Sequence, residues 1–236
     1  MEISEKELRD FIKNALHEDV RDGDHTSAST IPENASGKAK LLVKDDGIVA
    51  GVELAKLIFD EVDHDLKVEI LIKDGEEIKK GDIVLYVTGR DRSILTAERL
   101  VLNCMQRMSG IATVTHEMVE KLKGTQCKVL DTRKTTPGFR LLEKWAVKIG
   151  GGVNHRFGLF DMILIKDNHV DYAGGVKNAL FASQKYLKEK NLTLPIEIEV
   201  RNLDELAEVL EAGGVIRIML DNFSFENIKE ALKMID

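Results

Sequence analysis

The arrangement of strands and helices is most readily predicted outward from one segment, Cys127-Lys128-Val129-Leu130-Asp131-Thr132-Arg133-Lys134-Thr135-Thr136-Pro137-Gly138. A short apolar run leads into a polar loop, and a helical pattern follows Gly138. Strand and helix patterns alternate from here onward, which predicts a parallel sheet with right-handed crossovers. Because function gathers where the strands of such sheets end, the adjacent Arg133 and Lys134 suit an anionic ligand.

The residues around and after this stretch predict the elements of the sheet in turn. We expect strands near residues 127–130, 161–165, 195–200 and 215–220, and helices near residues 138–149, 174–188, 203–212 and 224–234. Four strands are too few to close a barrel of about eight. We therefore predict the α/β fold class, with an open, incomplete (β/α) barrel over residues 109–236 whose strand ends are the expected place of a functional site.

The part of the chain before this barrel has the pattern of an α+β sandwich domain, residues 1–108. Apolar residues alternate between Gly37 and Gly89, which predicts strands, and a helix interrupts them at residues 52–62. A capping box at residues 4–7 opens an N-terminal amphipathic helix.

Residues 91–123 carry a helical pattern that Ser109-Gly110 interrupts, so we predict two helices here. The positions expected to be buried are Leu95, Leu100, Val101, Met105, Met108, Val114, Met118 and Leu122. Arg99 and Arg107 lie in the same segment, and for each of them taken alone a surface ion pair is the simpler interpretation.

The composition is that of a globular protein with a net charge of −7, which argues against nucleic acid as the main partner. No apolar run approaches the roughly 20 residues that span a bilayer, and residues 1–9 lack the apolar core of a signal peptide. We therefore expect a cytoplasmic protein without a membrane partner. Cys104 and Cys127 lie in apolar patterns, so we predict that both are reduced residues of the core. The acidic loop from His17 to His25 lacks the spacing of a calcium loop, so we expect no metal held by the protein alone.

Positive charge concentrates between residues 133 and 166. Seven Lys and Arg residues stand there against Glu143 and Asp161, a local net charge of +5. The residues that could carry chemistry at the strand ends and around the glycine-rich turn are Arg133, Lys134, His155, Arg156, Lys166, Glu199 and Asp221. The cations suit a ligand with several carboxylates or phosphates, because Arg offers planar bidentate donors and Lys a mobile point charge.

Glu199 and Asp221 would face these cations from neighbouring strands. Two carboxylates there can hold sugar hydroxyls, bind Mg²⁺ carried in with a pyrophosphate, or stabilise a cationic sugar transition state. For any single residue an ordinary ion pair at the rim of the sheet is an alternative. Repetition at the same end of successive strands favours a binding site.

A series of motifs, in order from residue 18 to the end, resembles the quinolinate phosphoribosyltransferase family, the carboxylating nicotinate-nucleotide pyrophosphorylases of NAD biosynthesis. The motifs are Glu18-Asp19, Gly23-Asp24-His25-Thr26, Glu98-Arg99, Leu102-Asn103, Ser109-Gly110-Ile111-Ala112-Thr113, Asp131-Thr132-Arg133-Lys134-Thr135, Gly150 to Arg156, Ile165-Lys166-Asp167-Asn168-His169, Glu197-Ile198-Glu199-Val200 and Leu220-Asp221-Asn222-Phe223. The resemblance covers nearly the whole chain and is highly specific.

This resemblance implies an enzyme in which quinolinate attacks C1 of phosphoribosyl pyrophosphate and pyrophosphate leaves. The adduct then loses CO₂ to give nicotinate mononucleotide. By the same resemblance, Arg133, His155 and Arg156 hold the carboxylates of quinolinate. Arg99 reaches in from a partner subunit, so we expect at least a homodimer.

The resemblance also implies four catalytic residues that contact substrate. Lys134 and Lys166 meet carboxylate or phosphate groups, while Glu199 and Asp221 serve the ribose and the Mg²⁺ that arrives with phosphoribosyl pyrophosphate. The region around Gly213-Gly214 leaves the alignment open by one position, so Glu197 is an alternative to Glu199.

The chain departs from the family at Asp236, where members usually continue through two more strand-helix units that cradle the 5′-phosphate. Either the numbered sequence is incomplete, or it is a naturally shortened product with an exposed sheet edge. Three hypotheses follow. They are the quinolinate enzyme, a related phosphoribosyl-transferring enzyme for a different acid, and a truncated, catalytically impaired family member that acts as a binding or assembly partner.

Overall fold

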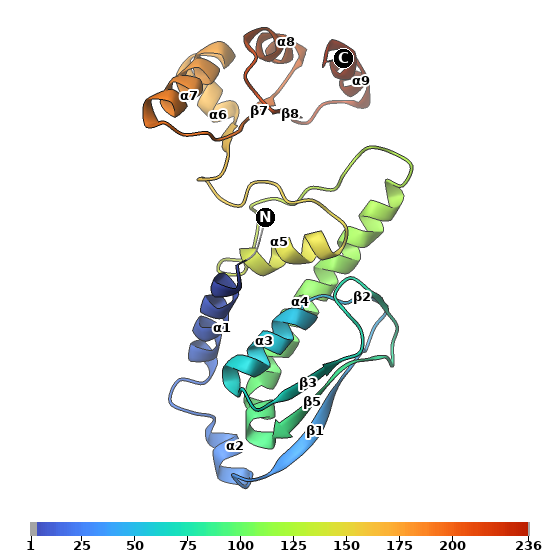
Figure 1. The fold of residues 1–236 in the computed structure, drawn as a ribbon. Helices are drawn as coiled ribbons and strands as arrows, with labels where there is room; N and C mark the ends of the chain where they lie inside the picture. The colour runs from blue at the N-terminus through green and yellow to red at the C-terminus, as the bar shows by residue number, and fades with distance from the viewer. Residues whose placement is uncertain (1–3, 236) are drawn as a thin grey trace. The chain divides into compact units, whose positions relative to one another are not determined.

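The computed structural model describes residues 4–235, and its contacts divide the chain into two compact units, residues 1–155 and residues 156–236. Each unit has its own hydrophobic core. Figure 1 labels most of the elements of both units. The predicted domain boundary between residues 108 and 109 falls within a long helix, α4, and stays a prediction.

The first unit combines two small antiparallel sheets with helices. Its elements are α1 (Glu5–Asp19), α2 (His25–Thr30), β1 (Ser36–Leu42), β2 (Gly47–Ile48), α3 (Val52–Val62), β3 (Lys67–Ile70), β4 (Glu77–Ile78), β5 (Ile83–Arg90), α4 (Asp91–Lys121) and α5 (Arg140–Ile149). The strands form one sheet in the order β1-β5-β3 and a second sheet from β2 and β4. The capping box that begins α1 is confirmed, since Ser4 and Glu7 exchange hydrogen bonds at 3.2 Å.

The core of this unit lies between the sheets and α3, α4 and α5. On the central strand β5, Val84, Leu85 and Val87 are buried, and on α3 Leu54 and Ile58 are fully enclosed. The period of two and the helix at residues 52–62 are therefore confirmed. An α+β arrangement results, in which the sheets bury one side against helices.

Helix α4 runs without a break through Ser109 and Gly110, so the predicted division into two helices is wrong. A glycine inside a helix costs only about 1 kcal/mol, and packing outweighs that cost here. The hydroxyl of Ser109 accepts a hydrogen bond from the Ala50 N–H at 2.9 Å and donates to the Ala50 carbonyl at 3.2 Å. On the same helix, Met108 and Ala112, which lie on either side of Ser109 and Gly110 in the sequence, are fully buried.

The buried face of α4 is narrower than the sequence predicts. Leu95, Val114 and Met118 are 44%, 51% and 48% exposed, so their predicted burial is wrong. The buried residues instead follow one stripe at spacings of three and four, namely Ile94, Ala97, Val101, Met105, Met108, Ala112 and Thr115. Leu95 and Val114 lie off this stripe, and Met118 lies one turn beyond its end.

The second unit is an open α/β layer. Its elements are β6 (Ile163–Ile165), α6 (Asp167–Ala173), α7 (Val176–Lys190), β7 (Ile196–Val200), α8 (Leu203–Ala212), β8 (Arg217–Leu220) and α9 (Phe225–Ile235). The strands pair in parallel in the order β6-β7-β8, with Ile163 opposite Ile196 and Ile198 opposite Ile218. The predicted α/β class with an unclosed sheet is confirmed.

Two predictions about residues 127–130 are wrong. The segment is no strand, because it contributes only an isolated parallel bridge between Leu130 and Val153. Cys127 is exposed, whereas Cys104 is buried as predicted and its burial raises the pKa of the thiol to about 12. Because only Leu130 of this segment pairs with another described residue, the segment is not flanked by strands on both sides, and its alternate side chains are not buried against a sheet. Among the described helices, none is long and apolar enough to cross a membrane.

Candidate active site

The loop from Asp131 to Thr136 presents the basic pair of the first unit. Arg133 is half-buried and Lys134 is exposed, and the Lys134 amide closes a local turn by donating to the Thr132 hydroxyl at 3.0 Å. Among the described residues, the Nε of Arg133 is buried and has no hydrogen-bond partner. Since a buried donor without an acceptor is costly, this guanidinium suits an anion that enters the loop.

A buried ion pair fixes the start of this loop. The side chains of Lys144 and Asp131 are 0% and 7% exposed, and the Lys144 Nζ donates to Asp131 and to the His155 carbonyl, the latter at 3.1 Å. The Asn154 amide donates to Asp131 at 2.6 Å, and the His155 N–H does so at 2.9 Å. One carboxylate thus ties the beginning of the Arg133 loop to the backbone of His155, which places both predicted ligand residues around one buried cluster.

A second buried carboxylate, Glu143, fixes the end of the loop. It accepts hydrogen bonds from the Arg107 guanidinium at 2.7 and 3.0 Å and from the Thr136 hydroxyl at 2.9 Å. Burial opposes ionisation of Glu143, but these hydrogen bonds outweigh it and hold its pKa below the usual value. Arg107, for which a surface ion pair was the simpler interpretation, is 56% exposed, but its partner is buried.

The Gly150-Gly151-Gly152 turn is packed and is no flexible linker. Gly150 and Gly152 are buried, and a Cβ on Gly150 would clash with the Ala112 carbonyl of α4. Gly151 has φ of +89°, a conformation that side chains rarely adopt. Glycine serves here for the close approach of the turn to α4.

In the second unit, charged side chains cover the face of the sheet opposite its core. Glu197 and Glu199 alternate along β7 with fully buried Ile198, so both carboxylates lie on the other face. The Lys166 Nζ contacts Glu199 at 3.0 Å, and Arg217 contacts Glu197 at 3.0 Å. Lys166 and Glu199 meet at the carboxyl ends of their strands, while the Glu197 pair lies deeper in the sheet.

Asp221 and Arg156 complete the predicted residues of the second unit. Asp221 directly follows β8, where its N–H donates to the Val200 carbonyl at 3.1 Å and its carboxylate accepts from Asn222 at 2.9 Å. The Arg156 guanidinium donates to the Met162 carbonyl at 3.2 Å. Lys166, Glu199 and Asp221 therefore follow or end successive parallel strands, as the sequence predicts.

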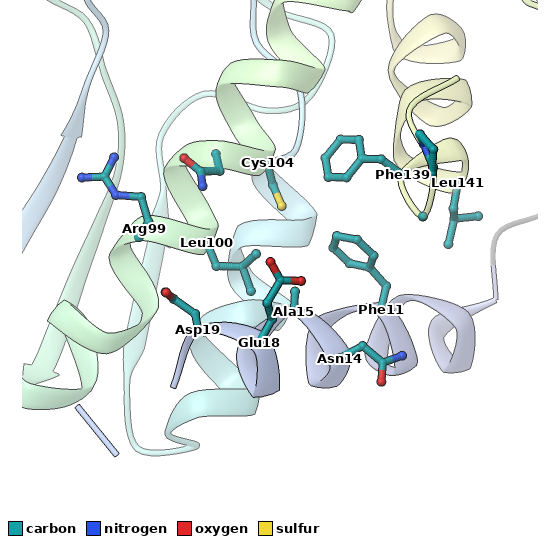
Figure 2. A pocket seen from close by; sticks show the side chains of 13 residues that line it. Phe11, Asn14, Ala15, Glu18, Asp19, Arg99, Leu100, Cys104, Phe139 and Leu141 are labelled. Carbon is teal, nitrogen blue, oxygen red and sulfur yellow. The ribbon is translucent and has the colours of Figure 1, made fainter. Parts of the chain in front are cut away.

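Arg99 stands apart from the loop residues in the first unit. It lies on α4 and lines a cavity of about 650 Å³ together with Glu18 and Asp19 of α1. In Figure 2 its side chain points away from Phe11 and Phe139, whose rings pack edge to face at 5.6 Å on the other side of this cavity. Among residues 4–235, no group of three or more His, Cys, Asp or Glu side chains is placed to hold a metal ion.

Comparisons with known proteins identify the family of this chain. Models of the N-terminal and C-terminal domains of quinolinate phosphoribosyl transferase match residues 24–109 and 111–236. The chain belongs to the quinolinate phosphoribosyltransferase family. It is 52% identical over 222 residues to the chloroplastic nicotinate-nucleotide pyrophosphorylase [carboxylating] of Arabidopsis thaliana, and the match covers 92% of this chain and 63% of that protein.

Bacterial relatives of the same family show a similar likeness. The nicotinate-nucleotide pyrophosphorylase [carboxylating] of Mycobacterium leprae is 44% identical over 91% of this chain and 75% of its own length. The crystal structure of NadC from Streptococcus pyogenes superposes with a TM-score of 0.92 at 39% identity, covering 100% of this chain and 82% of that one. The present chain thus spans a little under two thirds of the plant relative and a larger share of the bacterial ones.

Proposed function

We propose that this chain transfers the phosphoribosyl group of phosphoribosyl pyrophosphate to quinolinate with decarboxylation, which gives nicotinate mononucleotide, pyrophosphate and CO₂ for NAD biosynthesis. Its family membership supports the reaction, because the relatives carry the name of this activity. The observation that carries the proposal is the Arg133 guanidinium, whose buried Nε has no partner among the described residues. Such a donor, beside the exposed Lys134, suits a planar dianion.

In the proposed reaction the ring nitrogen of quinolinate bonds to C1 of the ribose as pyrophosphate leaves with the electron pair of the C1–O bond. The bond from C2 to its carboxylate then breaks, CO₂ departs, and the electron pair left on C2 takes up a proton. Arg133, His155 and Arg156 bind the two carboxylates and orient the ring. Lys134 adds positive charge near the site, so that the pyridinium adduct is held with its C2 carboxylate ready to leave.

The carboxylates of the second unit act on the sugar. Glu199, which Lys166 contacts at 3.0 Å, faces the ribose hydroxyls and the positive charge that develops at C1. Asp221 follows the neighbouring strand β8 and meets the Mg²⁺ that enters with phosphoribosyl pyrophosphate as part of the substrate. Lys166 also contacts substrate phosphate or carboxylate.

We further propose at least a homodimer in the cytoplasm. Arg99 is exposed on α4 and points away from Phe11 and Phe139 in Figure 2, which suits a residue that serves the site of a partner subunit. Both cysteines are free thiols in the structure, which suits a reducing compartment.

Replacing Arg133 by Ala tests the function directly. Purified protein is incubated with quinolinate, phosphoribosyl pyrophosphate and Mg²⁺, and nicotinate mononucleotide and CO₂ are measured. Loss of a charge-assisted hydrogen-bond pair of about 3 kcal/mol should lower kcat/KM for quinolinate by about 100-fold. Lys148→Ala, which removes an exposed cation of the same basic segment, is the control and should keep full activity.

Unchanged turnover in the Arg133→Ala variant would refute the assignment. Product from nicotinate in place of quinolinate would support an enzyme for a different acid. No product from any pyridine acid would support a binding or assembly partner.

A further inference from the structure

Two consecutive charged residues of α5 hold the two ends of the loop that carries Arg133 and Lys134. Lys144 binds the side chain of Asp131 at the start of the loop. Glu143 binds the N–H and the hydroxyl of Thr136 at its end, at 3.2 and 2.9 Å. We call Glu143 and Lys144 the α5 clamp.

Both clamp residues are buried in spite of their charge. The Lys144 side chain is fully enclosed, and the Glu143 side chain is 8% exposed. Burying a charge is costly unless it is paired and hydrogen-bonded, and removal of one partner is strongly destabilising. A loop that needed only to connect two segments would not require two such pairs, because polar contacts with solvent would serve.

The clamp fixes the backbone on both sides of the basic pair. Arg133 and Lys134 lie two and three residues after Asp131 and only three and two before Thr136, so little of the intervening chain is without an anchor. A donor that is placed before its ligand arrives loses less conformational entropy on binding.

We propose that Glu143 and Lys144 are positioning residues that hold Arg133 and Lys134 in the geometry needed to bind the carboxylates of the substrate. This inference rests on the proposed function and extends it to residues that contact no substrate. Glu143 is the sharper test, because it also draws Arg107 from α4 onto the end of the loop at 2.7 Å.

The chain offers a matched control for Glu143→Gln. Asp63 is a buried carboxylate that accepts hydrogen bonds from Arg90 at 2.6 and 2.7 Å and from the Ser93 hydroxyl at 2.6 Å. Arg90 is 57% exposed, as Arg107 is 56% exposed. Asp63→Asn therefore makes the same change of carboxylate to amide in the same kind of pair, at a site in the first unit with no contact to the loop.

Steady-state kinetics of the full chain separate the two variants. In Glu143→Gln, KM for quinolinate should rise about tenfold, which corresponds to about 1.4 kcal/mol, with KM for phosphoribosyl pyrophosphate little changed. Asp63→Asn should lose similar stability and keep the wild-type KM. An unchanged KM in Glu143→Gln, or an equal rise in Asp63→Asn, would overturn the proposal. Thr136→Val, which removes only one hydrogen bond to Glu143, should shift KM in the same direction and covers the case in which Glu143→Gln does not fold.

Amide hydrogen exchange tests the clamp without any turnover. The peptide that covers residues 131–136 should exchange faster in Glu143→Gln than in the wild type or in Asp63→Asn. Equal exchange in all three proteins would overturn the proposal. Inactive wild-type protein with a faster-exchanging loop in Glu143→Gln would instead leave the clamp intact and refute only the proposed reaction.

Discussion

Replacing Lys144 by Met would leave the buried carboxylate of Asp131 without its cation. Lys144 is fully enclosed and Asp131 is 7% exposed, so water cannot replace the ammonium group without opening the fold. Two donors to Asp131 remain, from Asn154 at 2.6 Å and from the His155 N–H at 2.9 Å. Breaking a buried ion pair by removing one partner costs about 3–5 kcal/mol, which we expect here as the loss in free energy of unfolding.

The single tryptophan makes this loss measurable for the first unit alone. Trp145 follows Lys144 on α5 and packs against the core of that unit. With an m-value of about 2 kcal/mol per molar urea, the midpoint of the fluorescence transition should fall by about 1.5–2.5 M. The double variant Lys144→Met with Asp131→Asn removes the orphaned charge as well and should recover part of the loss. A midpoint within about 0.3 M of the wild type would refute the reasoning, because the pair would then contribute under about 0.6 kcal/mol.

Two further predictions concern glycine and cysteine. Gly150→Ala should destabilise the first unit by about 1–3 kcal/mol, because its new Cβ clashes with the Ala112 carbonyl. Gly110→Ala places its Cβ in open space on α4 and should stabilise the unit by about 0.4–1 kcal/mol. Equal changes in the free energy of unfolding, measured in urea, would contradict this account. A thiol reagent should modify the exposed Cys127 quickly and the buried Cys104, whose pKa is raised to about 12, only after unfolding. Rapid modification of both thiols in the native protein would show that Cys104 is not enclosed.

The elements with strong periodicity could be predicted from the sequence, and their boundaries follow from local signals. Helix α8 occupies residues 203–212 as expected, since Asn202 caps it and Gly213 ends it. Helix α4 was divided wrongly at Gly110, because propensity is local and the contact of Ser109 with Ala50 spans 59 residues. Long-range contacts of this kind leave no trace in a short window of sequence.

The sequence predicts the charged residues at the strand ends of the candidate site, but not the buried residues that support its loop. The structure places Lys166, Glu199 and Asp221 at the carboxyl ends of neighbouring strands, as the sequence predicts, because charged residues that follow successive parallel strands share one edge of a sheet. Lys144 was not found, because it lies about 160–200° around the α5 helix from the buried Leu142 and Ala146 and so looks solvated. Its burial comes from the loop and the turn that cover the second side of the helix, which only the tertiary structure shows.

The structure divides the basic residues of the segment from 133 to 166 according to what their hydrogen bonds already serve. The Lys144 ammonium group is paired with Asp131, and Arg140 donates a hydrogen bond to the Thr135 hydroxyl at 3.0 Å, so both side chains support the loop. Arg133 differs, since its Nε is buried without a partner among the described residues. The net charge of +5 predicts an anion site but not which cations form it. Lys144 and Arg140 hold the loop through Asp131 and Thr135, whereas the buried Nε of Arg133 is left for a ligand to satisfy.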